Sequence, residues 1–225
     1  MSDRIIECIS LYKEYISKKQ KADALIDINL FINKNETVLL KGRSGAGKST
    51  LMNLMCGLIK PTRGKVIIDN NYINDLSDDE LSKLLSEKIG IIFQNFNLLP
   101  TYTVFENIEI AIFPKSLKAS LVKENIMYYL EQFNLKGKAH LLPSELSVGQ
   151  QQKVAIIRTL IKQPSIIFAD EPTGSVDDET AGEILSQLMN FRSEKQGTLV
   201  IATHGSIQDK LADRVYIIEN GRIKV

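Results

Sequence analysis

The 225-residue sequence predicts an α/β protein in which a helical segment interrupts a core built on a parallel sheet. Short runs rich in valine and isoleucine alternate with longer stretches of helical periodicity, the pattern of strands joined by crossover helices. One of these runs leads directly into a glycine-rich loop and a helix. From about residue 95 to 163 the strand pattern gives way to helical periodicity, so we expect a helical lobe inserted into the core.

The predicted strands are short and apolar, as expected for strands inside a sheet. They cover 5–9, 26–32, 37–41, 65–69, 90–93, 165–170, 198–203 and 214–219. The predicted helices cover 51–58, 78–87, 104–113, 117–133, 151–162 and 178–195. Ser77 followed by Glu80 is a capping box that opens the second helix. Asn220 and Gly221 form the turn of a final hairpin.

Composition excludes several classes of protein. The net charge of +1 gives no reason to expect a nucleic-acid partner. Cys8 and Cys56 stand among apolar neighbours and lack metal-ligand spacing, so we expect buried thiols in a reducing compartment. The N-terminus does not resemble a signal peptide, and no apolar run approaches the ~18 residues that span a bilayer. We expect a cytoplasmic chain whose membrane role comes through a partner.

The glycine-rich loop has the pattern G-x-x-x-x-G-K-[ST] between a predicted strand and a predicted helix, the context that this phosphate-binding motif requires. Glycines let backbone N–H groups converge on phosphate oxygens, and the helix N-terminus adds positive potential. Lys48 is expected to reach the β- and γ-phosphates, the Ser49 hydroxyl to ligate Mg²⁺, and Arg43 to face solvent. The loop consists of Gly42, Arg43, Ser44, Gly45, Ala46, Gly47, Lys48, Ser49 and Thr50.

Two carboxylates, Asp170 and Glu171, end the apolar run SIIFADE. Ligands of open α/β sheets lie at the carboxyl ends of the strands, so Asp170 is placed to hold Mg²⁺, directly or through water. Glu171 should point away from Asp170 by strand alternation and could polarise an attacking water. His204 follows the apolar strand TLVIAT, and we expect it to contact the γ-phosphate or the water. Gln94 reaches the same edge and suits a water or Mg²⁺ contact.

These motifs together resemble the ATP-binding subunit of ABC transporters, over nearly the whole chain. GRSGAGKST resembles the Walker A loop, IIFADE the Walker B strand and ELSVGQQQ the signature motif. The resemblance also makes Gln94 the Q-loop residue, residues 175–177 the D-loop and His204 the switch histidine. It makes Tyr15 the aromatic that stacks on adenine, with Tyr12 as a competing candidate.

The resemblance implies a single domain over 1–225, with a P-loop NTPase (RecA-like) core, an antiparallel β subdomain and an inserted helical subdomain. Residues 1–94 and 164–225 would form the core and β subdomain, and about 95–163 the helical subdomain. NLLPTYTVFENI and DEPTGSVD resemble the macrolide-exporter, lipoprotein-release and cell-division branch. The implied ligands are ATP and Mg²⁺. The implied partners are a second copy of the chain, a separate membrane permease at whose cytoplasmic face the chain sits, and extracytoplasmic accessory proteins.

The family mechanism places two ATP molecules between two chains. Each site would combine the Walker motifs, Tyr15, Gln94 and His204 of one chain with Ser147, Gly149 and Gln150 of the other, and Asp177 would lie at the seam. Sequence spacing alone leaves open a second arrangement, in which the helix after Gln150 returns to the ATP of its own chain.

Val148 stands where the signature motif might have glycine. Ser147 and Gln150 form a capping box, so Val148 should be the first helical residue, with a negative φ that valine accepts. Ser147 and Gly149 still offer a hydroxyl and an uncrowded N–H to a phosphate. We therefore predict that these residues still bind a phosphate, and that the Val148 side chain narrows the approach to them.

Other functions remain open at this stage. A regulator that controls a periplasmic enzyme would differ only in its membrane partner. A soluble ABC protein of DNA repair or translation usually carries a coiled coil or tandem domains, and neither is present. A P-loop kinase or GTPase would not explain ELSVGQQQ, and a binding-only module would require a defective signature motif.

Overall fold

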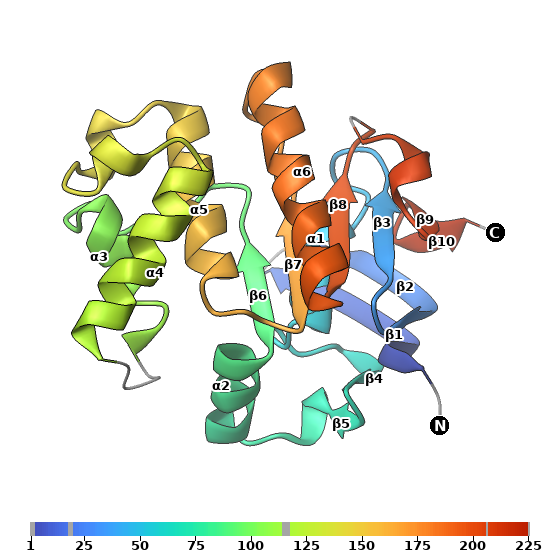
Figure 1. Ribbon diagram of the computed structural model, residues 1–225. Coiled ribbons are helices and arrows are strands. Elements are labelled where there is room, and N and C mark those ends of the chain that lie inside the picture. The colour runs from blue at the N-terminus through green and yellow to red at the C-terminus, as the bar shows by residue number, and fades with distance from the viewer. Residues whose placement is uncertain (1–2, 18–19, 114–117, 206, 225) are drawn as a thin grey trace.

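Two sheets organise the structure. The computed structural model describes residues 3–17, 20–113, 118–205 and 207–224. Figure 1 shows the larger sheet at the centre, the smaller sheet beside the N-terminus, and helices α3, α4 and α5 together on the opposite side. The predicted α/β class, with its antiparallel β region and helical insertion, is confirmed.

The larger sheet has six strands in the order β10-β9-β3-β8-β7-β6. All of its pairs are parallel except β9 with β10, which form the predicted hairpin around Asn220 and Gly221. The central strands β3, β7 and β8 are close to their predicted positions because they are continuous apolar runs, the pattern of strands buried on both faces. The six strands are β3 (Thr37–Lys41), β6 (Ile89–Ile92), β7 (Ile166–Asp170), β8 (Thr198–Thr203), β9 (Arg214–Glu219) and β10 (Arg222–Lys224).

The smaller sheet is antiparallel, in the order β2-β1-β4-β5. Its first two strands are much longer than predicted from 5–9 and 26–32. Apart from Ile16 the extensions contain no valine or isoleucine, so the content of these residues could not reveal them, and the register shifts past bulges such as that near Ser10. The strands are β1 (Arg4–Ser17), β2 (Gln20–Asn33), β4 (Arg63–Ile68) and β5 (Asn71–Tyr72).

Helix starts follow the caps rather than the apolar periodicity. Helix α1 begins at Lys48, three residues before the predicted start at 51. Helix α5 begins at Val148, as the capping box at Ser147 predicted, and not at 151, where the apolar periodicity placed it. Helix α3 ends at Glu109 rather than 113, where i→i+3 bonds replace the α-helical ladder. The predicted start of the fourth helix, residue 117, lies outside the described residues. The helices are α1 (Lys48–Met55), α2 (Asp78–Glu87), α3 (Val104–Glu109), α4 (Ala119–Gln132), α5 (Val148–Leu160) and α6 (Asp178–Lys195).

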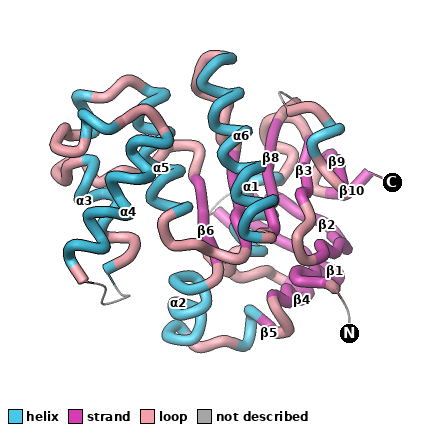
Figure 2. The backbone as a smooth tube through the Cα atoms, in the orientation of Figure 1, coloured by secondary structure: helices cyan, strands magenta, loops and turns pink. Residues whose placement is uncertain are grey.

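The apolar core divides along the two faces of the larger sheet. Val38 and Leu40 face the cluster formed with α1 and the smaller sheet. Leu39 between them faces the cluster formed with α3, α4, α5 and α6. Alternation along one strand therefore joins both halves of the molecule to a single sheet. Figure 2 shows the same division, with the helices of 104–160 on one side and the smaller sheet on the other.

No helix among the described residues combines the length and apolarity needed to cross a membrane.

Candidate active site

The larger sheet brings predicted site residues to one edge. β6, β7, β8 and β3 are successive neighbours and run parallel, so their carboxyl ends meet there (Figure 1). The glycine-rich loop follows β3, and His204 follows β8. Asp170 and Glu171 end β7, and Gln94 follows β6. Residues far apart in sequence thus converge where ligands of open α/β sheets bind.

The glycine-rich loop is folded tightly between β3 and α1. Gly45 and Gly47 have φ values of 78° and 107°, which side chains other than that of glycine rarely adopt. A Cβ at Gly42 would lie 2.3 Å from the carbonyl oxygen of Ile218, so the loop also passes too close to β9 for a larger residue. The sequence motif is therefore required by this path of the backbone, which leaves the loop N–H groups at the start of α1.

Lys48 is buried beneath this loop. Its Nζ donates hydrogen bonds to the carbonyl oxygens of Gly42, at 2.7 Å, and Arg43, at 3.2 Å. It also lies 3.8 Å from Oε1 of Glu171. A buried ammonium requires such partners because burial removes its hydration. Lys48 thus links the loop to the end of β7.

Glu171 has a backbone conformation that re-aims its side chain. Its φ is 48°, in the left-handed region, and β7 ends one residue earlier at Asp170. The strand alternation from which we predicted the direction of Glu171 therefore ends one residue before it, and this turn sets the direction of its side chain. The Glu171 N–H donates to the carbonyl of Ala202 at 2.9 Å. Its Oε2 lies 2.9 Å from Nδ1 of His204, so carboxylate and imidazole form a pair.

Asp170 is suited to a cation. Its Oδ1 is buried and has no hydrogen-bond partner among the described residues. A buried carboxylate oxygen without a donor is costly unless a cation or water satisfies it. The thiol of Cys56 lies nearby, and its pKa is raised, chiefly by burial and further by the Asp170 carboxylate. Both free cysteines are buried, as predicted, and burial raises the pKa of Cys8 to about 12.

Two adjoining cavities, of about 600 and 460 Å³, follow the loop. Gln94, Glu171 and His204 line them together with the loop, whereas Asp170 does not, and its Oδ1 is buried. The other lining residues are Ala24, Lys41, Gly174, Gly205, Ile218, Glu219 and Asn220.

A second group of predicted residues lines neither cavity: Tyr15, Ser147, Gly149, Gln150 and Asp177. Tyr15 is half-exposed on β1, with Nζ of Lys13 at 5.2 Å from its ring centroid. The competing Tyr12 has the Arg63 guanidinium carbon 5.0 Å from its ring centroid. The chain therefore assembles only part of the predicted site by itself.

The signature motif forms the predicted capping box. The Gln150 N–H donates to Oγ of Ser147 at 3.3 Å, and the Ser147 N–H donates to Oε1 of Gln150 at 3.1 Å. Val148 is the first helical residue and its φ is not positive, so that prediction is confirmed. Its side chain is 49% exposed. Valine is accommodated without strain, and it enlarges the surface that α5 presents beside Ser147 and Gly149.

Asp177 caps the next helix, α6. Its carboxylate accepts hydrogen bonds from the N–H and the hydroxyl of Thr180, both at 2.9 Å. These donors hold the pKa of Asp177 below its ordinary value. A Cβ on Gly149 would lie 3.2 Å from the Thr180 methyl group, so the signature motif and the D-loop segment pack closely within one chain.

Two polar residues of α5 were not predicted. Arg158 donates to the carbonyls of Phe96 and Asn97, both at 2.7 Å, and both acceptors have left-handed φ values. Gln152 is 2% exposed and donates to the Pro172 carbonyl at 2.9 Å. Their signal in the sequence is a polar residue at the apolar positions of an amphipathic helix.

The sequence and fold were compared with known proteins. Residues 25–174, more than half of the chain, match the sequence profile described as "ABC transporter". The chain belongs to the ABC transporter family. This confirms the predicted class, an ABC-type ATPase that serves as the ATP-binding subunit of a transporter. Among similar proteins, ATP-binding protein YtrE of Bacillus subtilis is 38% identical over 92% of this chain and 90% of its own length. The lipoprotein-releasing system ATP-binding protein LolD of Blochmanniella floridana is 35% identical over 98% and 94%.

A solved ABC cassette has the same fold. The ATP-binding cassette MJ0796 of Methanocaldococcus jannaschii, described as a dimer in a post-hydrolysis state bound to ADP and Pi, superposes with a TM-score of 0.93. It is 36% identical, with 98% of this chain and 97% of the other covered. ATP-cassette fold and nucleotide binding are therefore properties of the family to which this chain belongs.

Proposed function

We propose that two copies of this ABC cassette close around two ATP molecules, hydrolyse them, and drive a separately encoded membrane permease. The observation that carries the proposal is the division of the predicted site. The sheet edge assembles the Walker loop, Glu171, His204 and Gln94, whereas the α5 N-terminus and Asp177 stand apart from those cavities. If both groups of residues bind the same ATP, their separation within one chain is best explained by a site that forms between two chains.

In this proposal the Walker loop, residues 42–50, binds the phosphates. Its N–H groups and the start of α1 face the anion, and Lys48 exchanges its loop carbonyls for phosphate oxygens. Tyr15 stacks on the adenine ring, for which its half-exposed side chain on the smaller sheet is suited.

Hydrolysis requires a base for the attacking water. Glu171 takes the proton, because its carboxylate lies at the cavity wall between Lys48 and His204. His204, 58% exposed, orients that carboxylate and contacts the water or the γ-phosphate. Gln94, an exposed amide at the end of β6, positions the water.

The residues present fit a Mg²⁺ ion. Ser49 offers a hydroxyl at the start of α1, Asp170 a carboxylate oxygen without a donor, and Gln94 an amide oxygen. These are the hard oxygen ligands that Mg²⁺ prefers. When bound, the ion neutralises charge on the phosphate oxygens.

Ser147, Gly149 and Gln150 of the second chain complete each site. The hydroxyl of Ser147 and the N–H groups at the start of α5 supply further donors for the γ-phosphate. Asp177 lies at the seam between the chains. The dimeric MJ0796 cassette supports this arrangement, because it is similar over nearly its whole length.

The permease docks on the helical subdomain, which we place at residues 95–163 between core segments 1–94 and 164–225. A hollow of about 370 Å³ between α2, β6, α3 and α5 lies beside the Gln94 segment and suits this contact. The cassette then sits at the cytoplasmic face of the membrane, held by its permease. Its resemblance to the LolD branch extends the proposal to extracytoplasmic accessory proteins.

The proposal is tested by the dependence of ATPase rate on chain concentration. With Mg²⁺ and saturating ATP, the rate per chain should rise with concentration until dimers saturate, because isolated chains hold incomplete sites. A constant rate per chain would show that each chain carries a complete site. Absence of hydrolysis with retained ATP binding would favour a binding-only module.

A further inference from the structure

Gln152 occupies an unusual position on the signature helix. It lies five residues after Ser147, inside the protein, at 2% exposure. Its Nε2 donates a 2.9 Å hydrogen bond to the carbonyl of Pro172, which directly follows Glu171. Its Oε1 is also buried and has no hydrogen-bond partner among the described residues. A glutamine so placed costs desolvation for both polar atoms and recovers only one bond, so packing alone does not explain it.

The turn that Gln152 holds is the one that aims Glu171. Glu171 has a φ of 48°, and such a conformation persists only where surrounding contacts enforce it. The Glu171 N–H donates to the carbonyl of Ala202 in β8, and the Glu171 carbonyl accepts a hydrogen bond from the Gly174 N–H at 3.1 Å. The bond from Gln152 to Pro172 is the contact that comes from α5.

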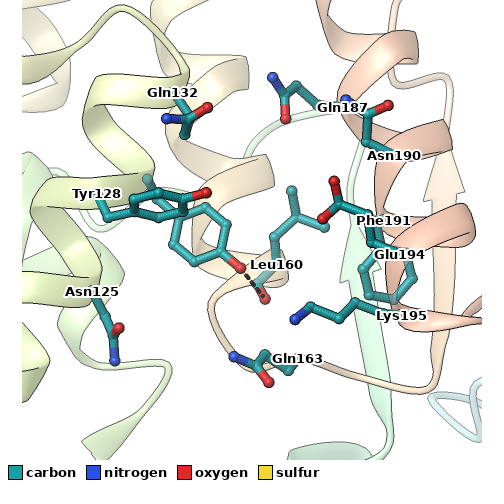
Figure 3. A pocket seen from close by; sticks show the side chains of 11 residues that line it. Asn125, Tyr128, Gln132, Leu160, Gln163, Gln187, Asn190, Phe191, Glu194 and Lys195 are labelled. Carbon is teal, nitrogen blue, oxygen red and sulfur yellow. Dashed lines mark hydrogen bonds between the residues drawn. The ribbon is translucent and has the colours of Figure 1, made fainter.

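Helix α5 also contacts α6, the helix that follows the Glu171 segment. Figure 3 shows a cavity of about 230 Å³ between α4 and α6, lined by side chains such as Tyr128, Gln132 and Gln187. Helix α5 instead contacts α6 directly: Gly149 packs on Thr180, and Lys153 forms an ion pair with Glu183. Together with the Gln152–Pro172 bond, these contacts attach α5 to the part of the chain that follows Glu171.

We propose that Gln152 is a positioning residue that holds the Glu171–Pro172 turn of its own chain in register with the signature helix. The inference rests on the proposed role of Glu171 as general base. It assigns α5 two contacts: its N-terminus touches the ATP of the partner chain, and Gln152, five residues on, holds the base of its own site. Binding of ATP at one site is thereby linked to the position of the general base at the other site.

Gln152→Met tests the claim because methionine matches the volume and removes both the donor and the unpaired oxygen. Losing the unpaired acceptor offsets the lost bond, so the variant should fold with a Tm close to that of wild type. The kcat for ATP should fall about 3- to 10-fold, the equivalent of one hydrogen bond, with KM within about twofold. A higher KM at unchanged kcat, or a kcat within twofold of wild type, would overturn the proposal.

Gln152→Glu supplies a readout that a packing role would not move. A protonated carboxyl can donate to the Pro172 carbonyl, and an ionised one cannot. Burial favours the protonated form. The Glu variant should therefore have a higher kcat than the Met variant at pH 6. Equal kcat for the two variants at every pH from 6 to 8 would contradict a donor role.

Amide hydrogen exchange separates this inference from the ATPase proposal, because it requires no turnover. In Gln152→Met the peptide that spans residues 170–176 should exchange faster, while β3 should not change. Lys136→Ala, which breaks an exposed ion pair outside α5, is the control and should change neither the exchange over 170–176 nor kcat. Unchanged exchange over 170–176 would sink the role of Gln152 even if the chain is an active ATPase. Faster exchange in a wild-type-derived chain that shows no ATPase activity would support the contact between Gln152 and the turn, but it would contradict the role of Glu171 as general base.

Discussion

The sheet edge and the start of α5 present phosphate-binding groups in two different ways. At the sheet edge, the Glu171 carboxylate already pairs with both Lys48 and His204, and Lys48 is buried. At the start of α5, the side chains of Ser147 and Gln150 each accept a hydrogen bond from the N–H of the other residue, and Val148 is half-exposed. The first region is prearranged by four parallel strands, and the second is a capped helix end that lines neither of the two cavities beside the glycine-rich loop.

This difference shows how one fold divides a catalytic site. Strand ends hold side chains firmly because the sheet fixes them on both sides, which suits the groups that handle protons and phosphates. A helix N-terminus offers N–H donors that need no further shaping, so it can be supplied by a partner at the moment of closure. Each of the substitutions below changes one of these two regions.

Glu171→Gln should have the largest effect. Removing the base should lower kcat by roughly 10²- to 10⁴-fold while ATP still binds. Light scattering should show a stable dimer in ATP, because closure is no longer followed by hydrolysis. Unchanged turnover in the purified cassette–permease complex would remove Glu171 from the role of base.

Lys48→Ala should weaken ATP binding by roughly 10- to 100-fold, since a charge-assisted phosphate contact is lost. It also leaves the largely buried Glu171 without its cation. Calorimetric titration with ATP measures the affinity. Lys136→Ala, which removes an exposed ion pair with Glu131, is the control and should bind as wild type does. Wild-type affinity in the Lys48 variant would count against the phosphate assignment.

Val148→Gly should raise kcat modestly, by about twofold, because it removes a branched side chain beside the donors of α5. Glycine lowers helix propensity by only ~0.5 kcal/mol relative to valine, and the helix start tolerates this. Val148→Ala should give an intermediate rate. A flat or lower rate in both variants would show that the valine contributes a contact of its own.

Removing the helix caps of α5 and α6 should have the smallest effect, a change in Tm that depends on pH for one cap and not for the other. Asp177 has a lowered pKa, so its contribution to stability is present above its unfolded pKa, near 3.8, and is lost as the pH falls through the folded value. Asp177→Ala should therefore lower Tm by a few degrees at pH 7 and by less at pH 3. Ser147 is a neutral cap, so the loss of Tm in Ser147→Ala should not depend on pH. Equal pH dependence for both would reject the charged-cap account.

Sequence reasoning succeeded where a local structural requirement can be met by only a few residue types. The glycines of the loop, the apolar strands of the larger sheet and the capping boxes at Ser77 and Ser147 lie where predicted. It failed where the cause lies in tertiary contacts. The left-handed turn at Glu171 and the buried amide of Gln152 depend on β8 and Pro172, which no local pattern specifies. The long polar ends of β1 and β2 depend on mutual pairing.

The central claim is that the start of α5 completes the site of a second chain. A crystal structure of Glu171→Gln with ATP and Mg²⁺ tests it most directly. We predict a dimer in which the Ser147 hydroxyl of one chain lies within ~3 Å of the γ-phosphate held by Lys48 of the other. A monomer with bound ATP, or a Ser147 that contacts the ATP of its own chain, would contradict the account.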